Sequence, residues 1–379
     1  MTHSTSITFV LPCLNEAKTL PLVLTAINEV RQRVYPDRFT EVVVSDNGST
    51  DESVPIAQAH GARVVACPER GYGSALTCGF KAAKGDIVVY ADADDTYDFR
   101  ETPALIAALD KGADLVIGSR MTGTIKPGAM PSLHRYLGTP VLNAIINILY
   151  GRRGGLVVDC NSGFRGFYRD KFFEWDVRGK GMEFASEMLV KALGSGVKIA
   201  HVPVTLRPDH KGRIPHLKTW KDGMRHLLQI LLNAPWFFNA VGLTIWGVAW
   251  TALLFSMLFG PILIGSVSVF GLHTMMFMLL GSHVGLAIWS IGLLLAARQT
   301  RRPSLYTRLL NLREDILLWS LVAFALIGAA LMLWIVATWI QHDLQLLALE
   351  QPTLVLIAAA SNLLVLASQI MAGHLVKLL

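Results

Sequence analysis

The sequence has little charge and few cysteines for its length. Only 16% of its 379 residues are charged, whereas 52% are hydrophobic. Its four cysteines show no CxxC spacing, which argues against a zinc site and indicates a reducing compartment rather than a disulfide framework. The N-terminal string MTHSTSITFV has no basic stretch followed by a long apolar core, so we expect no cleaved signal peptide.

Several nucleotide-binding and catalytic motifs are also absent. No GxGxxG follows the first apolar run, which disfavours a dinucleotide-binding fold, and the lack of GxxxxGK[ST] excludes a P-loop enzyme. No GxSxG occurs, so a nucleophilic serine on a strand-to-helix elbow is not expected. Without glycines that cradle phosphate, a bound nucleotide would need a metal ion to meet the charge of its diphosphate.

The hydrophobic residues concentrate in the C-terminal third. Four segments there are long enough to cross a bilayer, which takes about 20 apolar residues. None contains Asp, Glu, Lys or Arg, and they span residues 239–259, 274–297, 317–340 and 353–374. The connection 298–315 is strongly basic, while the other two connections carry no Lys or Arg. By the positive-inside rule the basic connection is cytoplasmic, which places the N-terminal part and the C-terminus in the cytoplasm too.

A second basic stretch precedes the first predicted span. Residues 207–225 carry a net charge of +4, and apolar residues at helical spacing follow them. A basic amphipathic segment of this kind lies on a membrane surface, attracted by anionic headgroups. Simple anchoring of a juxtamembrane helix explains Lys218, Lys221 and Arg225 as well as any further role does. The cations that precede the predicted helix and could reach an anionic ligand are Arg207, Lys211 and Arg213.

Before residue 235 the chain alternates predicted strands and helices. Strands are expected at 7–13, 41–46, 62–67, 86–91 and 113–119, and helices at 15–30, 49–61, 73–85 and 103–110. This alternation, with short joints rich in Gly and Asp, predicts an α/β fold with a doubly wound, mostly parallel sheet. Ligands bind such sheets at the carboxyl ends of the strands. The polar residues that fall at those ends are Asn15, Glu16, Asp46, Arg70 and the acids between 92 and 95.

The acids follow the fourth predicted strand, in the string VVYADADDTYDF, residues 88–99. They could simply cap and solvate a turn. Mg²⁺ and Mn²⁺, however, favour carboxylate oxygens and commonly take one or two carboxylates together with substrate phosphates. Asp92 and Asp94, with one residue between them, suit a metal ion at a strand end, although a DxD is a weak signal by itself.

Four segments carry a resemblance to a known family. FVLPCLNEAKTL, EVVVSDNGSTDES, RGYGSALTCGFKAAKGDIVVYADADD and DCNSGFRGF resemble the successive motifs of glycosyltransferase family 2, whose members have the inverting GT-A fold. With its C-terminal spans, the chain looks most similar to polyprenyl-phosphate glycosyltransferases of the dolichyl-phosphate glucose and mannose synthase type. The resemblance implies transfer of a single sugar from a nucleotide diphosphate-sugar to polyprenyl phosphate.

The resemblance also implies roles for individual residues. Asp92 and Asp94 would bind the metal ion, Mg²⁺ or Mn²⁺, and the diphosphate of the donor. Relatives with a DxDLQ motif offer a Gln where this chain has Thr96, so Asp95 or water would replace that ligand. We expect the nucleotide-sugar to be bound by Pro12, Asn15, Glu16, Asp46, Arg70, Asp92 and Arg120.

The acceptor determines whether the site needs a base or cations. A sugar hydroxyl needs a positioned carboxylate as general base, whereas a lipid phosphate is already ionised and needs cations to hold it. Arginine suits bidentate phosphate binding. For each candidate arginine the alternative is a structural ion pair or a position on the surface without a specific role. The candidate acceptor-phosphate ligands are Arg120, Arg135, Arg165, Arg207, Lys211 and Arg213. The residues expected to matter most for catalysis are Asp94, Arg135 and Arg207.

Two acidic residues are compatible with the alternative that the acceptor is a hydroxyl group. Glu183 and Glu187 are four positions apart, as on one face of a helix, and either could carry a general base. We favour a positioning role for Glu187. Asp159 and Arg165 either shape the floor of the acceptor site or form a structural pair that links loop to sheet.

Two other protein classes fit the sequence less well. A processive polysaccharide synthase would carry QxxRW where its cytosolic domain meets the membrane, and the nearest string, QTRRP at 299–303, lacks the Trp. A membrane scaffold or small transporter would account for the spans but not for the ordered acids of the sheet.

The sequence therefore predicts an inner-membrane (cytoplasmic-membrane) enzyme with its catalytic domain in the cytoplasm. The expected parts are a GT-A domain at 1–215, interfacial helices at 216–236 and a four-span domain at 237–379. UDP-glucose is the expected donor and GDP-mannose the alternative. The expected partners are a nucleotide-sugar, polyprenyl phosphate and the membrane. No nucleic-acid partner is expected, and the chain could form a homo-oligomer.

Overall fold

A computed structural model describes residues 5–151, 155–210, 219–264, 267–298, 313–341 and 351–378. The chain divides into two compact units, Met1–Asn233 and Ala234–Leu379. Lys211 and Arg213, two of the predicted acceptor ligands, lie outside the described residues, as does most of the basic connection 298–315.

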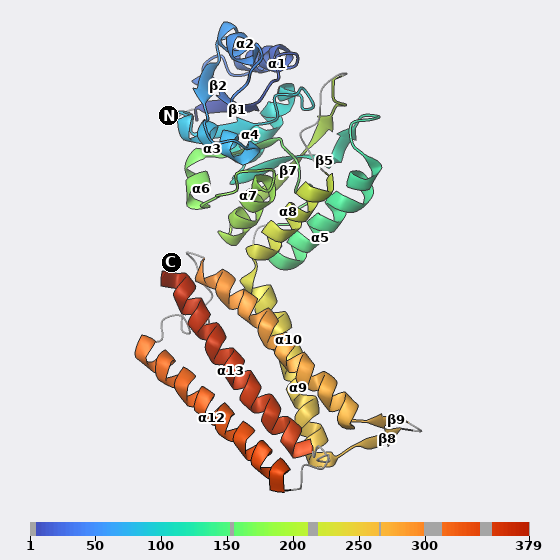
Figure 1. Cartoon of the computed structure of the whole chain (residues 1–379). Helices are drawn as coiled ribbons and strands as arrows, with labels where there is room; N and C mark the ends of the chain where they lie inside the picture. Colours follow the sequence, from blue (N-terminus) through green and yellow to red (C-terminus); the bar gives the residue numbers. More distant parts are fainter. Residues whose placement is uncertain are drawn as a thin grey trace. The chain divides into compact units, whose positions relative to one another are not determined.

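The first unit is built on a seven-stranded sheet with the strand order β3-β2-β1-β4-β6-β5-β7 (Figure 1). Its strands are β1 Ile7–Cys13, β2 Thr40–Asp46, β3 Arg63–Ala66, β4 Ile87–Tyr90, β5 Leu115–Ile125, β6 Arg165–Tyr168 and β7 Ile199–Leu206. All neighbouring pairs are parallel except those of β6, which runs antiparallel to β4 and β5. The predicted doubly wound, mostly parallel sheet is confirmed, and β6 and β7 are strands that the sequence pattern did not reveal.

The helices of this unit follow the strands in the order expected of an α/β fold. They are α1 Leu20–Arg33, α2 Ser53–Ala59, α3 Tyr72–Ala82, α4 Thr102–Asp110, α5 Thr139–Tyr150, α6 Arg169–Glu174, α7 Phe184–Gly194 and α8 Thr219–Leu232, with short turns η1 Phe99–Glu101 and η2 His134–Gly138. The first helix begins later than predicted. A turn ties Glu16 O to the N–H groups of Thr19 and Leu20, so residues 15–19 form a loop at the end of β1.

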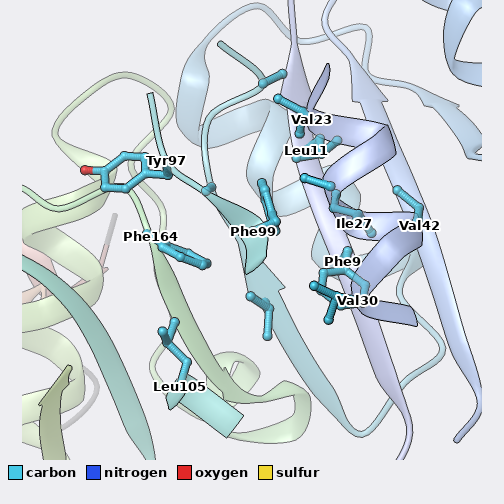
Figure 2. Close-up of a cluster of buried hydrophobic side chains, with 14 of the residues drawn as sticks. Phe9, Leu11, Val23, Ile27, Val30, Val42, Tyr97, Phe99, Leu105 and Phe164 are labelled. Atoms are coloured by element: carbon cyan, nitrogen blue, oxygen red, sulfur yellow. The ribbon is translucent and has the colours of Figure 1, made fainter. Parts of the chain in front are cut away.

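A hydrophobic core fixes the part of the sheet that carries the acids. Figure 2 shows Val23, Ile27 and Val30, one stripe of α1, on the side of the helix that faces the β1 strand. Phe9 of β1 and Phe99 of η1 meet edge to face, with ring centroids 6.1 Å apart. Fully burying a side chain of this size contributes about 1.5–3 kcal/mol. The loop after β4 is therefore anchored on both sides by buried residues.

The second unit is helical. Its helices are α9 Pro235–Phe259, α10 Leu272–Ala297, α12 Glu314–Gln341 and α13 Gln351–Leu378, with a small hairpin of β8 Ile262–Ile264 and β9 Val267–Val269 (Figure 1). All four helices are long and apolar enough to cross a membrane by length and composition. They coincide with the four predicted spans to within a few residues.

Small and polar residues hold these helices together. A Cβ added at Gly242 of α9 would lie 2.6 Å from Gly285 O of α10, so the two backbones cross where both residues are glycine. The Asn362 side chain accepts from Trp246 Nε1 (2.9 Å) and donates to Ser282 Oγ (3.0 Å), which links α9, α10 and α13. A polar group buried in hydrocarbon needs such partners, so the cluster satisfies its members without charge.

Candidate functional site

Parallel register brings the ends of β1, β2 and β4 to one edge of the sheet. Cys13 of β1 lies opposite Asp46 of β2, and Val10 lies opposite Tyr90, the last residue of β4. The loops after these strands consequently meet, and Pro12 lies in β1 beside Ser45. The prediction that the polar strand ends converge therefore agrees with the observed arrangement.

Asn15 and Glu16 join the loop after β1 to its neighbours. The Asn15 side chain accepts from Thr50 N at 2.8 Å, and its own N–H donates to Ser49 Oγ at 3.0 Å. Asn15 has a φ of 58°, a left-handed conformation that asparagine tolerates better than most residues. Thr19 reaches Glu16 Oε2 at 3.2 Å and Ala93 O at 2.8 Å, which connects this loop to the acidic motif.

Asp46 shapes the loop after β2 and is nearly buried. Its carboxylate accepts from the N–H groups of Gly48 and Ser49, each at 3.1 Å. Arg70 crosses over this loop and donates from Nη1 to Asn47 O (2.7 Å) and Gly48 O (3.2 Å). Because both acceptors are neutral carbonyls, these contacts orient the Arg70 guanidinium without neutralising its charge.

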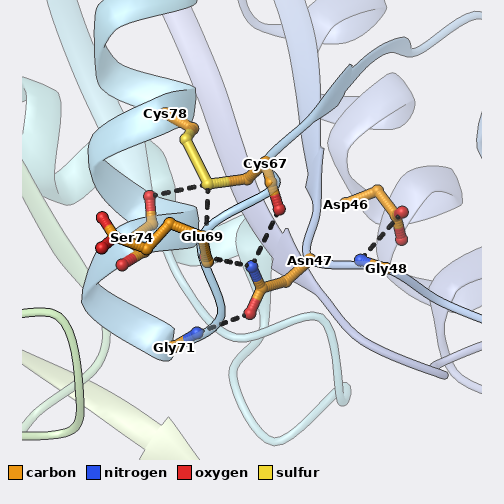
Figure 3. Close-up of a disulfide and its surroundings, with 8 residues drawn as sticks. All are labelled: Asp46, Asn47, Gly48, Cys67, Glu69, Gly71, Ser74 and Cys78. Carbon is orange, nitrogen blue, oxygen red and sulfur yellow. Dashed lines mark hydrogen bonds between the residues drawn. A yellow bond between two sulfur atoms is a disulfide. The ribbon is translucent and has the colours of Figure 1, made fainter.

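Asn47 connects the β2 loop to the segment between β3 and α3, and the sequence analysis missed it. Its amide nitrogen donates to Cys67 O (3.1 Å) and Glu69 O (2.7 Å), while its oxygen accepts from Gly71 N (2.8 Å), as Figure 3 shows. The sequence offered one signal for Asn47, its position directly after a predicted strand. The two segments that Asn47 connects can be identified only from the fold.

The same segment carries a disulfide. Cys67, just after β3, is bonded to Cys78 of α3, with Cα atoms 5.9 Å apart (Figure 3). The expectation of a reducing compartment rather than a disulfide framework does not hold for these two cysteines, because α3 folds back along the sheet edge and brings Cys78 over the end of β3. Cys13 and Cys160 are free and buried, and burial raises their thiol pKa to about 11 and about 12, so both stay protonated.

The acidic motif sits in the loop after β4, with Asp94 nearly buried. Asp94 Oδ1 accepts from Thr96 N at 3.1 Å and from Thr96 Oγ1 at 2.6 Å. Thr96, at the position of the family's Gln, thus orients the carboxylate. Tyr72 hydrogen-bonds Asp92, and burial beside that carboxylate raises the pKa of the Tyr72 hydroxyl well above its ordinary value. Tyr72 therefore remains a donor to Asp92 across the physiological range.

Asp95 is engaged elsewhere in the site. It adopts a positive φ of 60°, and its carboxylate lies 3.1 Å from Arg207 Nη1 and 3.0 Å from His210 Nε2. Arg207 also pairs with Asp98 and donates its backbone N–H to Thr96 O at 2.8 Å. These contacts disfavour Asp95 as the substitute metal ligand. They also suggest that Arg207 positions the acidic loop, a different role from the predicted acceptor-phosphate contact.

The two carboxylates of the DxD fit a divalent cation that substrate completes. Within the described ranges no group of three or more His, Cys, Asp or Glu forms a ready-made metal site. A Cβ added at Gly163 would lie 2.8 Å from Asp92 Oδ2, so a side chain at this position would displace the carboxylate. Mg²⁺ and Mn²⁺ sites of one or two carboxylates plus phosphate oxygens match this donor set.

Arg120 and Arg165 are built into the protein framework. Arg120 forms a two-point ion pair with the fully buried Asp159, at 2.9 Å and 2.7 Å, so Asp159 pairs with Arg120 and not with Arg165, which was one of the two alternatives for that residue pair. Arg165 is itself fully buried and donates to the carbonyls of Ser162, Ala185 and Cys160. Both guanidinium groups hold loops in place, which favours structural roles over the predicted acceptor contact.

Arg135 has the fewest protein contacts among those predicted arginines that the structure describes. It is exposed on η2, and its guanidinium carbon lies 5.4 Å from the centroid of the Tyr136 ring. A cation–π contact at an exposed site contributes only about 0.5–1 kcal/mol and leaves the charge available.

Glu187 lies at the start of α7 and is almost completely buried. Its oxygens accept from Arg178 N (3.2 Å) and Gly179 N (2.5 Å) and pair with Lys191 Nζ (2.8 Å). This carboxylate anchors the segment before α7, and its positioning role in catalysis stays a prediction. Glu183 differs, because its Oε2 is buried without a hydrogen-bond partner in the described part of the chain.

Comparison with known proteins places the first unit among sugar transferases. Residues 8–175 match the family described as Glycosyl transferase family 2. The low-salt glycan biosynthesis hexosyltransferase Agl6 of Haloferax volcanii is 37% identical over 277 residues, which cover 71% of this chain and 63%, less than two thirds, of that protein. An uncharacterised glycosyltransferase of Mycobacterium tuberculosis is 36% identical over 208 residues, covering 55% of this chain and 88% of its own.

Two further relatives carry more specific names. The dolichyl-phosphate hexose transferase of Haloferax volcanii is 31% identical over 195 residues, or 51% of this chain and 79% of that protein. The crystal structure of glucosyl-3-phosphoglycerate synthase from Mycobacterium tuberculosis in complex with Mn²⁺, UDP and glucosyl-3-phosphoglycerate is 26% identical, covers 61% of this chain and 80% of that one, and superposes with a TM-score of 0.49.

Proposed function

This chain belongs to glycosyl transferase family 2, and on that premise we propose that it transfers a single hexose from a nucleotide diphosphate-sugar to polyprenyl phosphate. UDP-glucose is the proposed donor, with GDP-mannose as the alternative. The observation that carries the proposal is the meeting of Asp92 and Asp94 with Asn15, Glu16 and Asp46 at one edge of the sheet, in a chain with four apolar helices.

The proposed donor site follows from this edge. The base and ribose would lie over the ends of β1 and β2, against Pro12, Asn15, Asp46 and Arg70, and the diphosphate would extend to Asp92 and Asp94. Asp92 and Asp94 would hold a divalent cation, which would neutralise charge on the diphosphate. Thr96 keeps Asp94 in one orientation, and Tyr72 does the same for Asp92, so the two carboxylates are set before the substrate arrives.

The chemistry proposed is a single displacement. An oxygen of the lipid phosphate attacks the anomeric carbon, the bond from that carbon to the donor diphosphate breaks, and the nucleoside diphosphate leaves with the electron pair. The phosphate is already ionised, so no protein base has to remove a proton. Glu187, whose two oxygens are taken up by Arg178, Gly179 and Lys191, supports this route because it leaves that position without a free carboxylate.

A hydroxyl acceptor is the second candidate. Glu183 supports it, because Oε1 accepts from Gly181 N at 2.9 Å while the buried Oε2 has no partner among the described residues and could accept a proton. Such an acceptor would require a general base of this kind.

The proposed cellular setting is the cytoplasmic membrane with the first unit in the cytoplasm. Four candidate spans and the strongly basic connection 298–315 support this orientation. A polyprenyl phosphate resides in the membrane, so a membrane-bound enzyme can bind this acceptor without extracting it from the bilayer.

A donor and acceptor screen on detergent-purified protein tests the function. UDP-glucose and GDP-mannose, each radiolabelled in the sugar, are incubated with Mg²⁺ or Mn²⁺ and either polyprenyl phosphate or the matching polyprenol. The proposal predicts label in a lipid with polyprenyl phosphate only. Transfer to the polyprenol would favour the hydroxyl-acceptor candidate, a polymer would point to a processive synthase, and no transfer from any donor would contradict both candidates.

A further inference from the structure

A cavity of about 540 Å³ in the first unit is lined by residues other than those of the acidic motif. It is formed by the joint between β3 and α3, the segment before α7, and one face of α8. The residues that line it are Arg70, Gly71, Lys180, Gly181, Glu183, Arg225, Leu228 and Gln229. None of the roles described so far uses this cavity as a whole.

One side of the cavity is formed by a close backbone contact between Gly71 and Lys180. Gly71 has a φ of 136°, and a Cβ there would lie 2.1 Å from Lys180 O, so only glycine allows the two segments to touch. Lys180 O accepts from Ser74 N at 3.2 Å, and Glu187 holds the backbone just before it through Gly179 N. The position of Lys180 is therefore fixed by its backbone, while its side chain reaches Glu69 in an exposed ion pair.

Helix α8 supplies the opposite wall. Arg225, Leu228 and Gln229 are spaced i, i+3 and i+4, so they share the face of the helix that borders the cavity. His226, which follows Arg225 in the chain, is buried, and its Nδ1 lies 2.9 Å from Ser186 Oγ of α7. This contact fixes the rotation of α8 about its axis. Within the described ranges the structure records no ion pair for Arg225.

The charge in the cavity is positive. Three cations line it, Arg70, Lys180 and Arg225, against the single carboxylate of Glu183. Because Lys180 is already paired with Glu69, the remaining balance of Arg70 and Arg225 against Glu183 is one positive charge, which favours an anionic group such as a phosphate. Among the described residues Arg70 donates to the neutral carbonyls of Asn47 and Gly48, which do not neutralise its charge.

We propose that this cavity binds the phosphate group of the lipid acceptor, with Arg225 and Lys180 as direct ligands; this rests on the proposed function. Two features select a lipid phosphate over the donor diphosphate. The cavity offers cations where the DxD offers carboxylates, so it holds phosphate without a metal. In addition, α8 carries the exposed apolar residues Met224, Leu228 and Leu232 and is followed in the chain by α9, a candidate span. Such a helix suits a ligand whose phosphate is attached to a hydrocarbon chain.

Arg225→Ala in the full-length protein tests the assignment, with Arg33→Ala, an exposed arginine at the end of α1, as the matched control. Binding of polyprenyl phosphate, UDP and inorganic phosphate is measured separately in detergent, beside the KM of each substrate. The loss of one charge-assisted contact predicts a roughly 10-fold or greater rise in Kd and KM for polyprenyl phosphate. Arg225→Lys should restore part of the lost affinity for polyprenyl phosphate. The control Arg33→Ala should show no change in Kd or KM. Lys180→Ala, an exposed side chain, gives a second measurement that does not depend on α8.

The outcomes separate the ligand sources. Weakened polyprenyl phosphate binding with unchanged UDP binding supports the assignment, and competition by inorganic phosphate shows that the headgroup is what the cavity recognises. Equal weakening of UDP binding would assign the cavity to the donor and overturn the inference. Unchanged binding in both Arg225→Ala and Lys180→Ala would also overturn it while leaving the proposed function intact. If the wild-type protein neither binds nor uses polyprenyl phosphate, the proposed function fails first.

Discussion

Replacing Glu187 by Gln separates an anchoring role from a catalytic one. The two carboxylate oxygens accept from Arg178 N and Gly179 N and pair with Lys191, in a side chain that is only 3% exposed. A glutamine has one acceptor oxygen, so its NH₂ group would face one of the two backbone N–H groups. We therefore expect the substitution to destabilise the first unit rather than to block a chemical step.

The magnitude follows from the hydrogen bonds that the substitution removes. Hydrogen bonds to a charged group contribute about 1.5–3 kcal/mol, and a buried donor left without a partner costs about 1–3 kcal/mol. We expect a loss of roughly 2–4 kcal/mol in the free energy of unfolding. For a domain of 150–250 residues each kcal/mol lowers Tm by about 2–4 °C, which gives a decrease of roughly 4–16 °C.

The assay combines thermal unfolding with initial rates in the same detergent. Glu174→Gln is the matched control, because Glu174 forms an exposed i,i+3 pair with Lys171 at 3.7 Å and should shift Tm very little. At a temperature where Glu187→Gln is folded, its kcat should remain within a few-fold of wild type. An unchanged Tm with kcat reduced by about 10²–10⁴-fold, the range of general-base catalysis, would refute the anchoring role.

Three further substitutions test other parts of the site. Asp94→Asn should abolish transfer and weaken Mn²⁺-dependent binding of the nucleotide-sugar while Tm changes little; full turnover by this variant, or by wild type in EDTA, would remove the metal role. Cys78→Ser should lower the free energy of unfolding by about 2–3 kcal/mol, because the cross-link closes a loop between residues 11 apart; wild type treated with reductant should match it, and an unaltered denaturation midpoint would contradict this. Arg207→Ala should raise KM for the nucleotide-sugar more than for the lipid, because Arg207 holds Asp95 and Asp98 of the acidic loop; the reverse pattern would restore it as an acceptor ligand.

The general position of the site could be predicted because it depends on local pattern. Alternating strands and helices imply a parallel sheet, and a parallel sheet brings its strand ends together, so Asn15, Asp46 and Asp94 could be grouped without coordinates. The spans were predictable for a similar reason, since about 20 uncharged apolar residues have few alternatives to crossing a membrane.

The pairing of charges could not be predicted in the same way. Asp159 bonds to Arg120, which lies 39 positions away, rather than to the nearby Arg165, which the fold buries among carbonyls. Cys67 and Cys78 look like isolated cysteines until α3 folds over the end of β3. The cavity beside Arg225 likewise depends on the contact of α8 with α7 through His226 and Ser186. In each case tertiary packing selects the partner, and sequence spacing gives no information about it.

The chemical identity of the product tests the central claim most directly. Polyprenyl phosphate labelled with ¹⁸O in its phosphate is incubated with the purified protein, UDP-glucose and Mn²⁺, and the lipid product is analysed by mass spectrometry. We predict the addition of one hexose, joined through a labelled phosphate oxygen to an inverted anomeric carbon and released as free hexose by mild acid. A product that carries the hexose on a hydroxyl group, or more than one hexose per lipid, would contradict transfer of a single sugar to a lipid phosphate.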